Sequence, residues 1–286
     1  MPFVTVGKEN TTDINLYYED HGNGPAVVLL SGWPLDSRSW EPQLHALLAA
    51  GHRVIMYDRR GFGQSDRPTQ GYDFGTLADD LDILLTKLDL REAVLVGFSL
   101  GTGELARYIG TRGTSRLAGS VFIESLAPSF GKSDENPNGV DQATVDTVRQ
   151  AILDDRPAWL TGLLGDFLNL DDYLGKRVSE ETVRNNWDAG AGASPWATWA
   201  CVLTWLDDFH DDIKRIDVPT LIMHGTADRI LSVAGQGRRM HAALPDAKYV
   251  EIEGGPHVMC VTHAAEVNRE LLAFLDSVNP VGGGSA

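Results

Sequence analysis

The stretch Ala93-Val-Leu-Val-Gly-Phe-Ser-Leu-Gly101 decides the fold, together with the helical pattern that continues it over 101–112. Its first half, 93–97, is a short apolar run, which is typical of a strand covered on both faces. Its second half places Ser99 between two glycines, which permit a tight turn. A buried strand that turns sharply into a helix indicates one unit of a parallel sheet, with Ser99 at the turn.

Similar apolar runs recur along the chain, with helical patterns between them. They predict further buried strands at 26–31, 53–57, 119–123, 220–224 and 248–252. Helices are predicted at 38–50, 75–88, 234–244 and 261–277. Two earlier segments, 3–6 and 14–19, alternate apolar and polar residues and predict an antiparallel edge. The sequence therefore predicts an α/β fold with a mostly parallel eight-stranded sheet flanked by helices.

The alternation of strands and helices stops between residues 127 and 215. This region has helical patterns and many aromatic residues, and we interpret it as a helical cap, 127–215, inserted into a core domain of 1–126 and 216–278. Residues 279–286 are glycine-rich and predict a flexible tail. We expect most of the aromatic side chains of the cap to form its core and two or three to face a substrate. They are Trp159, Phe167, Tyr173, Trp187, Trp196, Trp199, Trp205 and Phe209.

Composition excludes several classes of partner. The net charge is −16 and the isoelectric point is about 4.8, so nucleic acid and anionic membrane surfaces are not expected partners. No stretch approaches the roughly 18–20 apolar residues of a membrane helix, and Met1 to Asn10 lack the pattern of a signal peptide. Two cysteines without metal or redox spacing, Cys201 and Cys260, predict reduced thiols and a cytoplasmic protein.

Ser99 is the predicted nucleophile. The residues Gly97-Phe-Ser-Leu-Gly101 match G-x-S-x-G, and the strand before them and the helix after them are the context that this motif requires. The sharp turn exposes the serine hydroxyl above the sheet, and the helix N-terminus favours negative charge that develops nearby. If these glycines formed only a structural turn, the histidine and the aspartate described next would have no explanation.

His257 is the predicted general base. It lies in Gly254-Gly-Pro-His257, a loop five residues beyond the last predicted strand, where the base of such a site is expected. Of the other histidines, His224 ends a strand and is expected to be packed and hydrogen-bonded. His45, His241 and His263 fall in helical patterns and are expected to be solvated.

Asp228 is the predicted acid that orients the base. It follows the strand 220–224, and the order Ser…Asp…His is the one that this motif uses. A carboxylate at this position fixes the tautomer of the imidazole and stabilises the imidazolium. Glu124, at the end of another strand, is the rival acid; otherwise it is a residue at the end of the sheet or at the hinge of the cap.

An oxyanion hole needs two backbone N–H groups that point at one position. We assign one to Leu100, which follows the nucleophile, and the other to Trp33 in the loop Ser31-Gly32-Trp33-Pro34. An ordinary turn remains an alternative for this tetrapeptide.

Several segments together resemble one family, and the likeness is weakest in the cap. The chain resembles the bacterial cofactor-free haloperoxidases, also described as bromoperoxidases or perhydrolases, and the aryl esterases of the α/β-hydrolase superfamily. The segments are Met1-Pro-Phe-Val-Thr-Val-Gly7, Leu16-Tyr-Tyr-Glu-Asp-His-Gly22, Tyr57-Asp-Arg-Arg-Gly-Phe-Gly-Gln-Ser65, Val96-Gly-Phe-Ser-Leu-Gly-Thr-Gly103, Ile216-Asp-Val-Pro219 and Thr262-His-Ala-Ala-Glu-Val-Asn268.

The resemblance implies the α/β-hydrolase fold and an enzyme without metal, haem or other cofactor. Its serine would be acylated by a small carboxylic ester or acid, and hydrogen peroxide could replace water as the acceptor and release a peracid. The peracid would then oxidise bromide or chloride. The family also includes plain esterases and enzymes that cleave small lactams, and its members commonly form homo-oligomers, as trimers or hexamers.

One departure from the family and two competing interpretations remain at this stage. The family usually has histidine before the glycine of the oxyanion loop, where this chain has Ser31, which puts the rigidity of that loop in question. Ser99 argues against dehalogenases and epoxide hydrolases, whose nucleophile is an aspartate. A non-catalytic binding protein with this fold is the remaining alternative, although such proteins usually lose one of the three catalytic residues, and none is lost here.

Overall fold

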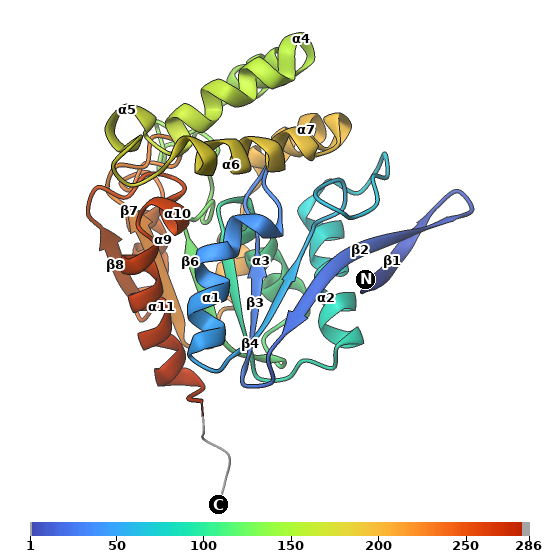
Figure 1. Cartoon of the computed structure of the whole chain (residues 1–286), viewed down its shortest axis with the longest axis vertical. Helices are drawn as coiled ribbons and strands as arrows, with labels where there is room; N and C mark the ends of the chain where they lie inside the picture. Colours follow the sequence, from blue (N-terminus) through green and yellow to red (C-terminus); the bar gives the residue numbers. More distant parts are fainter. Residues whose placement is uncertain (1, 282–286) are drawn as a thin grey trace, which may run out of the picture.

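The computed structural model describes residues 2–281, which form an eight-stranded sheet with helices on both faces (Figure 1). The spatial order of the strands is β1-β2-β4-β3-β5-β6-β7-β8. Strands β1 and β2 are antiparallel to their neighbours and all other pairs are parallel, which confirms the predicted sheet. The bounds are β1(Phe3–Glu9), β2(Thr12–His21), β3(Ala26–Leu30), β4(Arg53–Tyr57), β5(Ala93–Phe98), β6(Leu117–Ile123), β7(Thr220–Gly225) and β8(Lys248–Ile252).

The antiparallel edge is longer than the sequence pattern predicts. Strands β1 and β2 form a hairpin around Asn10, whose φ of 54° is left-handed. Asparagine tolerates this conformation better than most residues. The tight turn lets pairing continue to the ends of both strands, which is why they extend beyond 3–6 and 14–19.

The two faces of the sheet are packed into separate hydrophobic clusters, because side chains alternate between faces along a strand. In β3, Val28 packs in the cluster that includes side chains of α2 and α3, whereas Leu29 packs in the one that includes side chains of α1 and α11. The helices flanking the sheet are η1(Ser37–Trp40), α1(Glu41–Ala49), α2(Phe74–Lys87), α3(Leu100–Arg112), α9(Gly237–Ala243), α10(Met259–Thr262) and α11(Ala264–Val278).

Helices also fill the stretch between β6 and β7, and α4 to α7 gather beyond one end of the sheet (Figure 1). The longest, α4, is kinked at Asp155, two residues before Pro157, whose ring lacks the N–H that a helix interior requires. The division into core and cap at residues 127 and 215 stays a prediction. These helices are α4(Gln142–Phe167), α5(Leu170–Tyr173), α6(Glu180–Gly192), α7(Pro195–Cys201), η2(Val202–Leu206) and α8(His210–Ile213).

Three smaller expectations can be compared with the structure. Within the described residues, no helix combines the length and the apolar character needed to cross a bilayer. Residues 282–286 of the predicted tail lie outside the described residues. The prediction that His263 is solvated is wrong: it is 2% exposed, because it lies at the junction of α10 and α11 against the ring of Tyr173.

Candidate active site

Ser99 lies at the sharp turn between β5 and α3. Its backbone angles, φ 52° and ψ −119°, are unusual for a residue with a side chain, and Ile123 accepts a hydrogen bond from its N–H. The flanking glycines are sterically required. A Cβ on Gly97 would lie 2.7 Å from the carbonyl oxygen of Gly101, and one on Gly101 would lie 2.3 Å from the carbonyl oxygen of Leu30. The G-x-S-x-G spacing therefore follows from the packing of this turn.

His257 connects the serine to a carboxylate. Its Nε2 lies 2.9 Å from Oγ of Ser99, and its Nδ1 lies 2.8 Å from Oδ2 of Asp228. The imidazole is fully buried and is packed against the rings of Phe98 and Phe167. An Nδ1–H that donates to the carboxylate leaves Nε2 free to accept the proton of the serine hydroxyl, which is the arrangement needed for a general base.

Asp228 is held by its own loop. Its Oδ1 accepts hydrogen bonds from the N–H groups of Ile230 and Leu231, at 2.7 and 2.9 Å, so that Oδ2 is directed to His257. Burial opposes ionisation of this carboxyl, but the charge and hydrogen bond of His257 outweigh burial and hold the pKa of Asp228 below its usual range. The acid is therefore an anion at neutral pH.

The loops that carry Asp228 and His257 are packed directly on each other. The N–H of Ala227 donates to the carbonyl oxygen of Gly255 at 3.0 Å. A Cβ on Gly225 would lie 2.1 Å from the same carbonyl oxygen, so only glycine fits there. This contact fixes the spacing of the acid and the base without help from their side chains.

The loop that precedes Trp33 lies against the nucleophile. A Cβ on Gly32 would lie 2.6 Å from the ring of Phe98 and 3.1 Å from Cβ of Ser99. Leu100 is the first residue of α3, so its N–H has no partner within the helix. Both residues that we expect to form the oxyanion hole thus border Ser99, and both line the pocket described below.

Arg59 supports this loop by a hydrogen bond to Ser31. Ser31 is the residue at which the family usually has a histidine. Nη2 of Arg59 donates to the carbonyl oxygen of Ser31 at 2.9 Å, and the guanidinium is paired with Glu104 on α3. Arg59 and Glu104 are 4% and 0% exposed. Sequence reasoning missed both residues, because Arg59 entered only as part of a segment shared with the family and a glutamate on a helix is ordinarily exposed.

An apolar pocket opens at the serine. Its lining contains no lysine, arginine, aspartate or glutamate. Two of the eight cap aromatics singled out in the sequence, Phe167 and Trp205, line it, whereas Trp196 is 49% exposed. The lining residues are Trp33, Ser99, Leu100, Leu126, Phe130, Leu163, Phe167, Trp205, Ile230, Leu231 and His257. Such a lining suits a small uncharged group.

The helical region also contacts the loops that carry the candidate base and acid. The carbonyl oxygen of Phe167 accepts the N–H of Val258 at 2.9 Å, and Nδ2 of Asn169 donates to the carbonyl oxygen of Ala227 at 2.9 Å. The segment around α5 therefore contacts the loop of the base and the loop of the acid, besides closing the pocket with the ring of Phe167.

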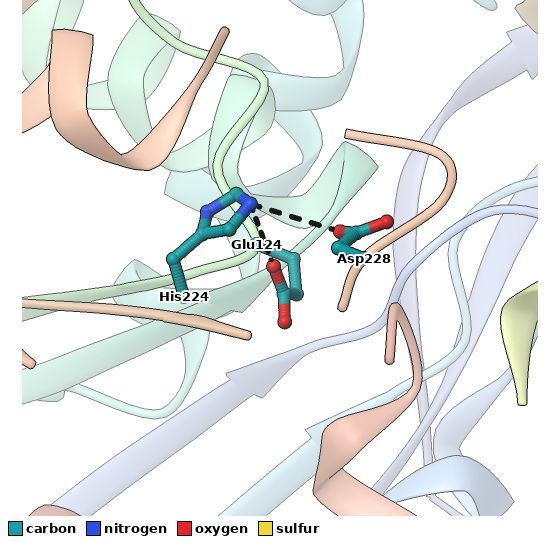
Figure 2. Close-up of side chains that lie close together, drawn as sticks. All are labelled: Glu124, His224 and Asp228. Atoms are coloured by element: carbon teal, nitrogen blue, oxygen red, sulfur yellow. Dashed lines mark ion pairs between the residues drawn. The ribbon is translucent and has the colours of Figure 1, made fainter. Parts of the chain in front are cut away.

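One group of side chains in the described part of the chain has the composition of a metal site. It consists of Glu124, His224 and Asp228, called here the Glu124 cluster (Figure 2). Two of its ligand atoms are already engaged: Nε2 of His224 lies 2.6 Å from the carbonyl oxygen of Leu231, and Oδ2 of Asp228 is bonded to His257. An ion could bind only by displacing both contacts, so the geometry fits a hydrogen-bonded cluster better than a metal centre.

The fold and the site define the class of protein. A nucleophile turn after β5, a buried histidine after β8 and an aspartate after β7 are the arrangement of an α/β hydrolase. The model of the α/β hydrolase fold family matches residues 25–264. The chain therefore belongs to the α/β hydrolase fold family, and its relatives place it in the group of that family that contains non-heme haloperoxidases.

Three similar proteins illustrate this placement. A Synechocystis sp. protein, named provisionally as a non-heme chloroperoxidase, is 50% identical over 96% of this chain and 100% of its own. The crystal structure of a bromoperoxidase from Bacillus anthracis has a TM-score of 0.91 and 44% identity, covering 96% of this chain and 99% of that one. A bifunctional esterase/perhydrolase from Acinetobacter calcoaceticus is 31% identical over 95% of this chain and 100% of its own.

Proposed function

We propose that this protein is a serine hydrolase that forms an acyl-enzyme on Ser99 from small, uncharged carboxylic esters, and that it transfers the acyl group to water or to hydrogen peroxide. The observation that carries the proposal is the hydrogen-bonded chain from Ser99 through His257 to Asp228, which ends in an apolar pocket. The esterase/perhydrolase and haloperoxidase relatives support peroxide as the second acceptor.

The geometry suggests how acylation proceeds. As Oγ of Ser99 attacks the carbonyl carbon of the ester, its proton passes to Nε2 of His257, and Asp228 stabilises the imidazolium. The N–H groups of Leu100 and Trp33 are proposed to hold the oxyanion. The tetrahedral intermediate then expels the alcohol, which takes the proton from His257 and leaves an acyl group on the serine.

Deacylation repeats these steps with a second acceptor. His257 removes a proton from water or hydrogen peroxide, whose oxygen attacks the acyl carbon, and Ser99 leaves with the proton. Water releases a carboxylic acid, and hydrogen peroxide releases a peracid. Bromide or chloride then reduces the peracid to the carboxylic acid and, with one proton, becomes hypohalous acid. Because this last step needs no protein group, halide oxidation follows from peracid release.

The substitution Ser99→Ala tests the proposal, because hydrolysis and peracid formation share one acyl-enzyme. We expect the variant to lose ester hydrolysis, peracid yield and peroxide-dependent bromination together, while circular dichroism shows a folded protein. The measurement is p-nitrophenyl acetate turnover with and without peroxide and bromide. Bromination by the variant at the wild-type rate would contradict the shared intermediate.

Plain esterase or small-lactam amidase activity is the second candidate, and the apolar pocket accommodates it equally well. It is favoured if ester turnover is rapid and peroxide leaves the product entirely as carboxylic acid. A non-catalytic binding protein is the third, and covalent labelling of Ser99 by a fluorophosphonate probe would eliminate it.

Two finer properties belong to the proposal as well. We propose a cytoplasmic protein, which is supported by the free thiols of Cys201 and Cys260. We also propose a homo-oligomer, as a trimer or hexamer, from the family resemblance alone. Light scattering coupled to size-exclusion chromatography measures the oligomer directly.

A further inference from the structure

Glu124 lies at the end of β6, one strand away from the loop of the acid, and its side chain is fully buried. Its backbone φ of 49° is left-handed, which is costly for a residue with a side chain. Its Oε1 accepts the N–H of Gly225 at 2.9 Å, and its Oε2 lies 2.9 Å from Nε2 of His224. Figure 2 shows one ring nitrogen of His224 facing the carboxyl groups of both Glu124 and Asp228.

The proton on His224 can be assigned from geometry. Its Nε2 lies 2.6 Å from the carbonyl oxygen of Leu231, and a carbonyl oxygen only accepts hydrogen bonds, so Nε2 carries a hydrogen. Nδ1 has no partner among the described residues, and burial lowers the pKa of His224. His224 is therefore a neutral imidazole and supplies no positive charge to the carboxyls beside it.

Glu124 then faces the anion of Asp228 without a cation of its own. The titratable groups around it are Asp228 and His224, His257 beyond them, and Cys260 on α10. Burial, followed by the charge of Asp228, raises the pKa of Glu124 well above its usual range. The facing oxygens of Glu124 and Asp228 lie within 4.8 Å of each other, and two buried carboxyls this close share a proton more readily than they both ionise.

We propose that Glu124 is a positioning residue of the catalytic site: as a neutral carboxylic acid it donates a hydrogen bond to Asp228 and so moderates the pull of Asp228 on the proton of His257. The inference rests on the proposed function, because it assumes that Asp228 and His257 act as acid and base. A carboxylate that accepts one more hydrogen bond attracts the imidazolium less. A variant that lacks this hydrogen bond should therefore need a higher pH to reach full activity.

The first test is the pH profile of kcat/KM for p-nitrophenyl acetate in Glu124→Leu, Glu124→Gln and the wild type. Leucine removes the hydrogen-bond donor to Asp228. The acidic limb, which is the rise of kcat/KM on the acidic side of the profile, should therefore move to higher pH by about half a pH unit. Glutamine keeps the shape and an N–H donor, so its limb should stay near that of the wild type. Ser120→Ala, a buried substitution on the same strand, is the matched control and should leave the limb unmoved.

Other outcomes of this test would overturn the inference. A limb that moves to lower pH in Glu124→Leu would mean that Glu124 is a carboxylate that adds negative charge. Loss of turnover in both Glu124 variants with an unmoved limb would mean that its role is only structural. If the wild type neither hydrolyses esters nor reacts with fluorophosphonate at Ser99, the proposed function fails, and the next measurement still decides the protonation of Glu124.

The second test is infrared spectroscopy at neutral pH, which does not depend on activity or on the folding of Glu124→Leu. The difference spectrum between wild type and Glu124→Gln should contain the carbonyl stretch of a protonated carboxyl, and this band should shift in D₂O. Only a carboxylate band in the difference spectrum would overturn the inference.

Discussion

Two buried clusters lie beneath the two halves of the candidate active site and differ in charge balance. Under the oxyanion loop, the guanidinium of Arg59 is bonded to Glu104 at 2.7 and 2.9 Å. Under the base, the Glu124 cluster holds two carboxyls and a neutral histidine without any lysine or arginine. The first cluster pairs its carboxylate with a cation of its own, whereas the second contains no cation, and the nearest group beyond it is the imidazole of His257.

This difference separates two uses of buried charge. A guanidinium that donates two hydrogen bonds to one carboxylate is held in a defined orientation, so the pair suits the support of a backbone group such as the carbonyl of Ser31. An uncompensated cluster has protonation states that depend on its neighbours, so it suits control of an acid and a base. Substitutions that change the charge of only one cluster should therefore differ in how they affect turnover and the free energy of unfolding.

The largest effect is expected for Asp228→Asn, which removes the charge that the Glu124 cluster offers to His257. The amide cannot fix the productive tautomer, and a comparable change in a known triad lowers turnover about 10⁴-fold. Steady-state ester hydrolysis measures this loss, with circular dichroism as the folding control. If Glu124→Gln abolished turnover and Asp228→Asn had a mild effect, the assignment of the acid would be wrong.

Arg59→Met should break the compensated pair. Glu104 would remain buried without its cation, which typically costs about 3–5 kcal/mol of unfolding free energy, measurable by urea denaturation. The double variant Arg59→Met/Glu104→Gln removes both charges and keeps a partner for Tyr57, which is hydrogen-bonded to Glu104, so most of the stability should return.

Ester turnover should stay low in both Arg59 variants, because the carbonyl group of Ser31 has lost its donor in each. Wild-type turnover in the double variant would show that Arg59 does not position the oxyanion loop. Equal stability of the single variant and the wild type would show that the pair is not effectively buried.

The smallest effect is a dependence of stability on pH. The pKa of Glu124 is raised in the folded protein, so the folded state holds a proton that the unfolded state releases above the usual value of 4.5. Wild-type stability therefore falls as pH rises from 4.5 toward the raised pKa, whereas Glu124→Gln has no such loss. The stability of the variant relative to the wild type should grow with pH in urea denaturation.

A second titration cancels in this comparison. Burial raises the pKa of Asp80, which is paired with Arg60, to about 6, but it does so in both proteins. A stability difference that is constant from acidic to neutral pH would show that Glu124 has an ordinary pKa when folded.

The sequence predicts the sheet well, because continuous apolar runs can be buried only as covered strands and the glycines around Ser99 mark a turn with one packing solution. It also selects Ser99, Asp228 and His257 by their positions after strands. It does not predict that Glu124 faces Asp228, because the residue lies on a neighbouring strand and its partner is defined only when the sheet is assembled.

Arg59 and Glu104 were missed for a related reason. Each is a charged residue in a segment whose pattern does not distinguish a solvated from a buried charge, and their pairing spans 45 residues. His263 shows the opposite error: a helical pattern was extended through a junction between two short elements, and the residue at the junction is buried. Local pattern therefore finds the three candidate residues whose side chains the fold brings together, but not the buried charged residues packed beneath them.

The most direct test of the central claim is mass spectrometry of the peptide that contains Ser99, after acid quench of the protein mixed with p-nitrophenyl acetate. We predict one acetyl group on Ser99, absent in Ser99→Ala, whose lifetime shortens when hydrogen peroxide is added while peracetic acid appears in solution. Peracetic acid formation without an acetylated Ser99, or with an acetyl group whose lifetime does not respond to peroxide, would contradict it.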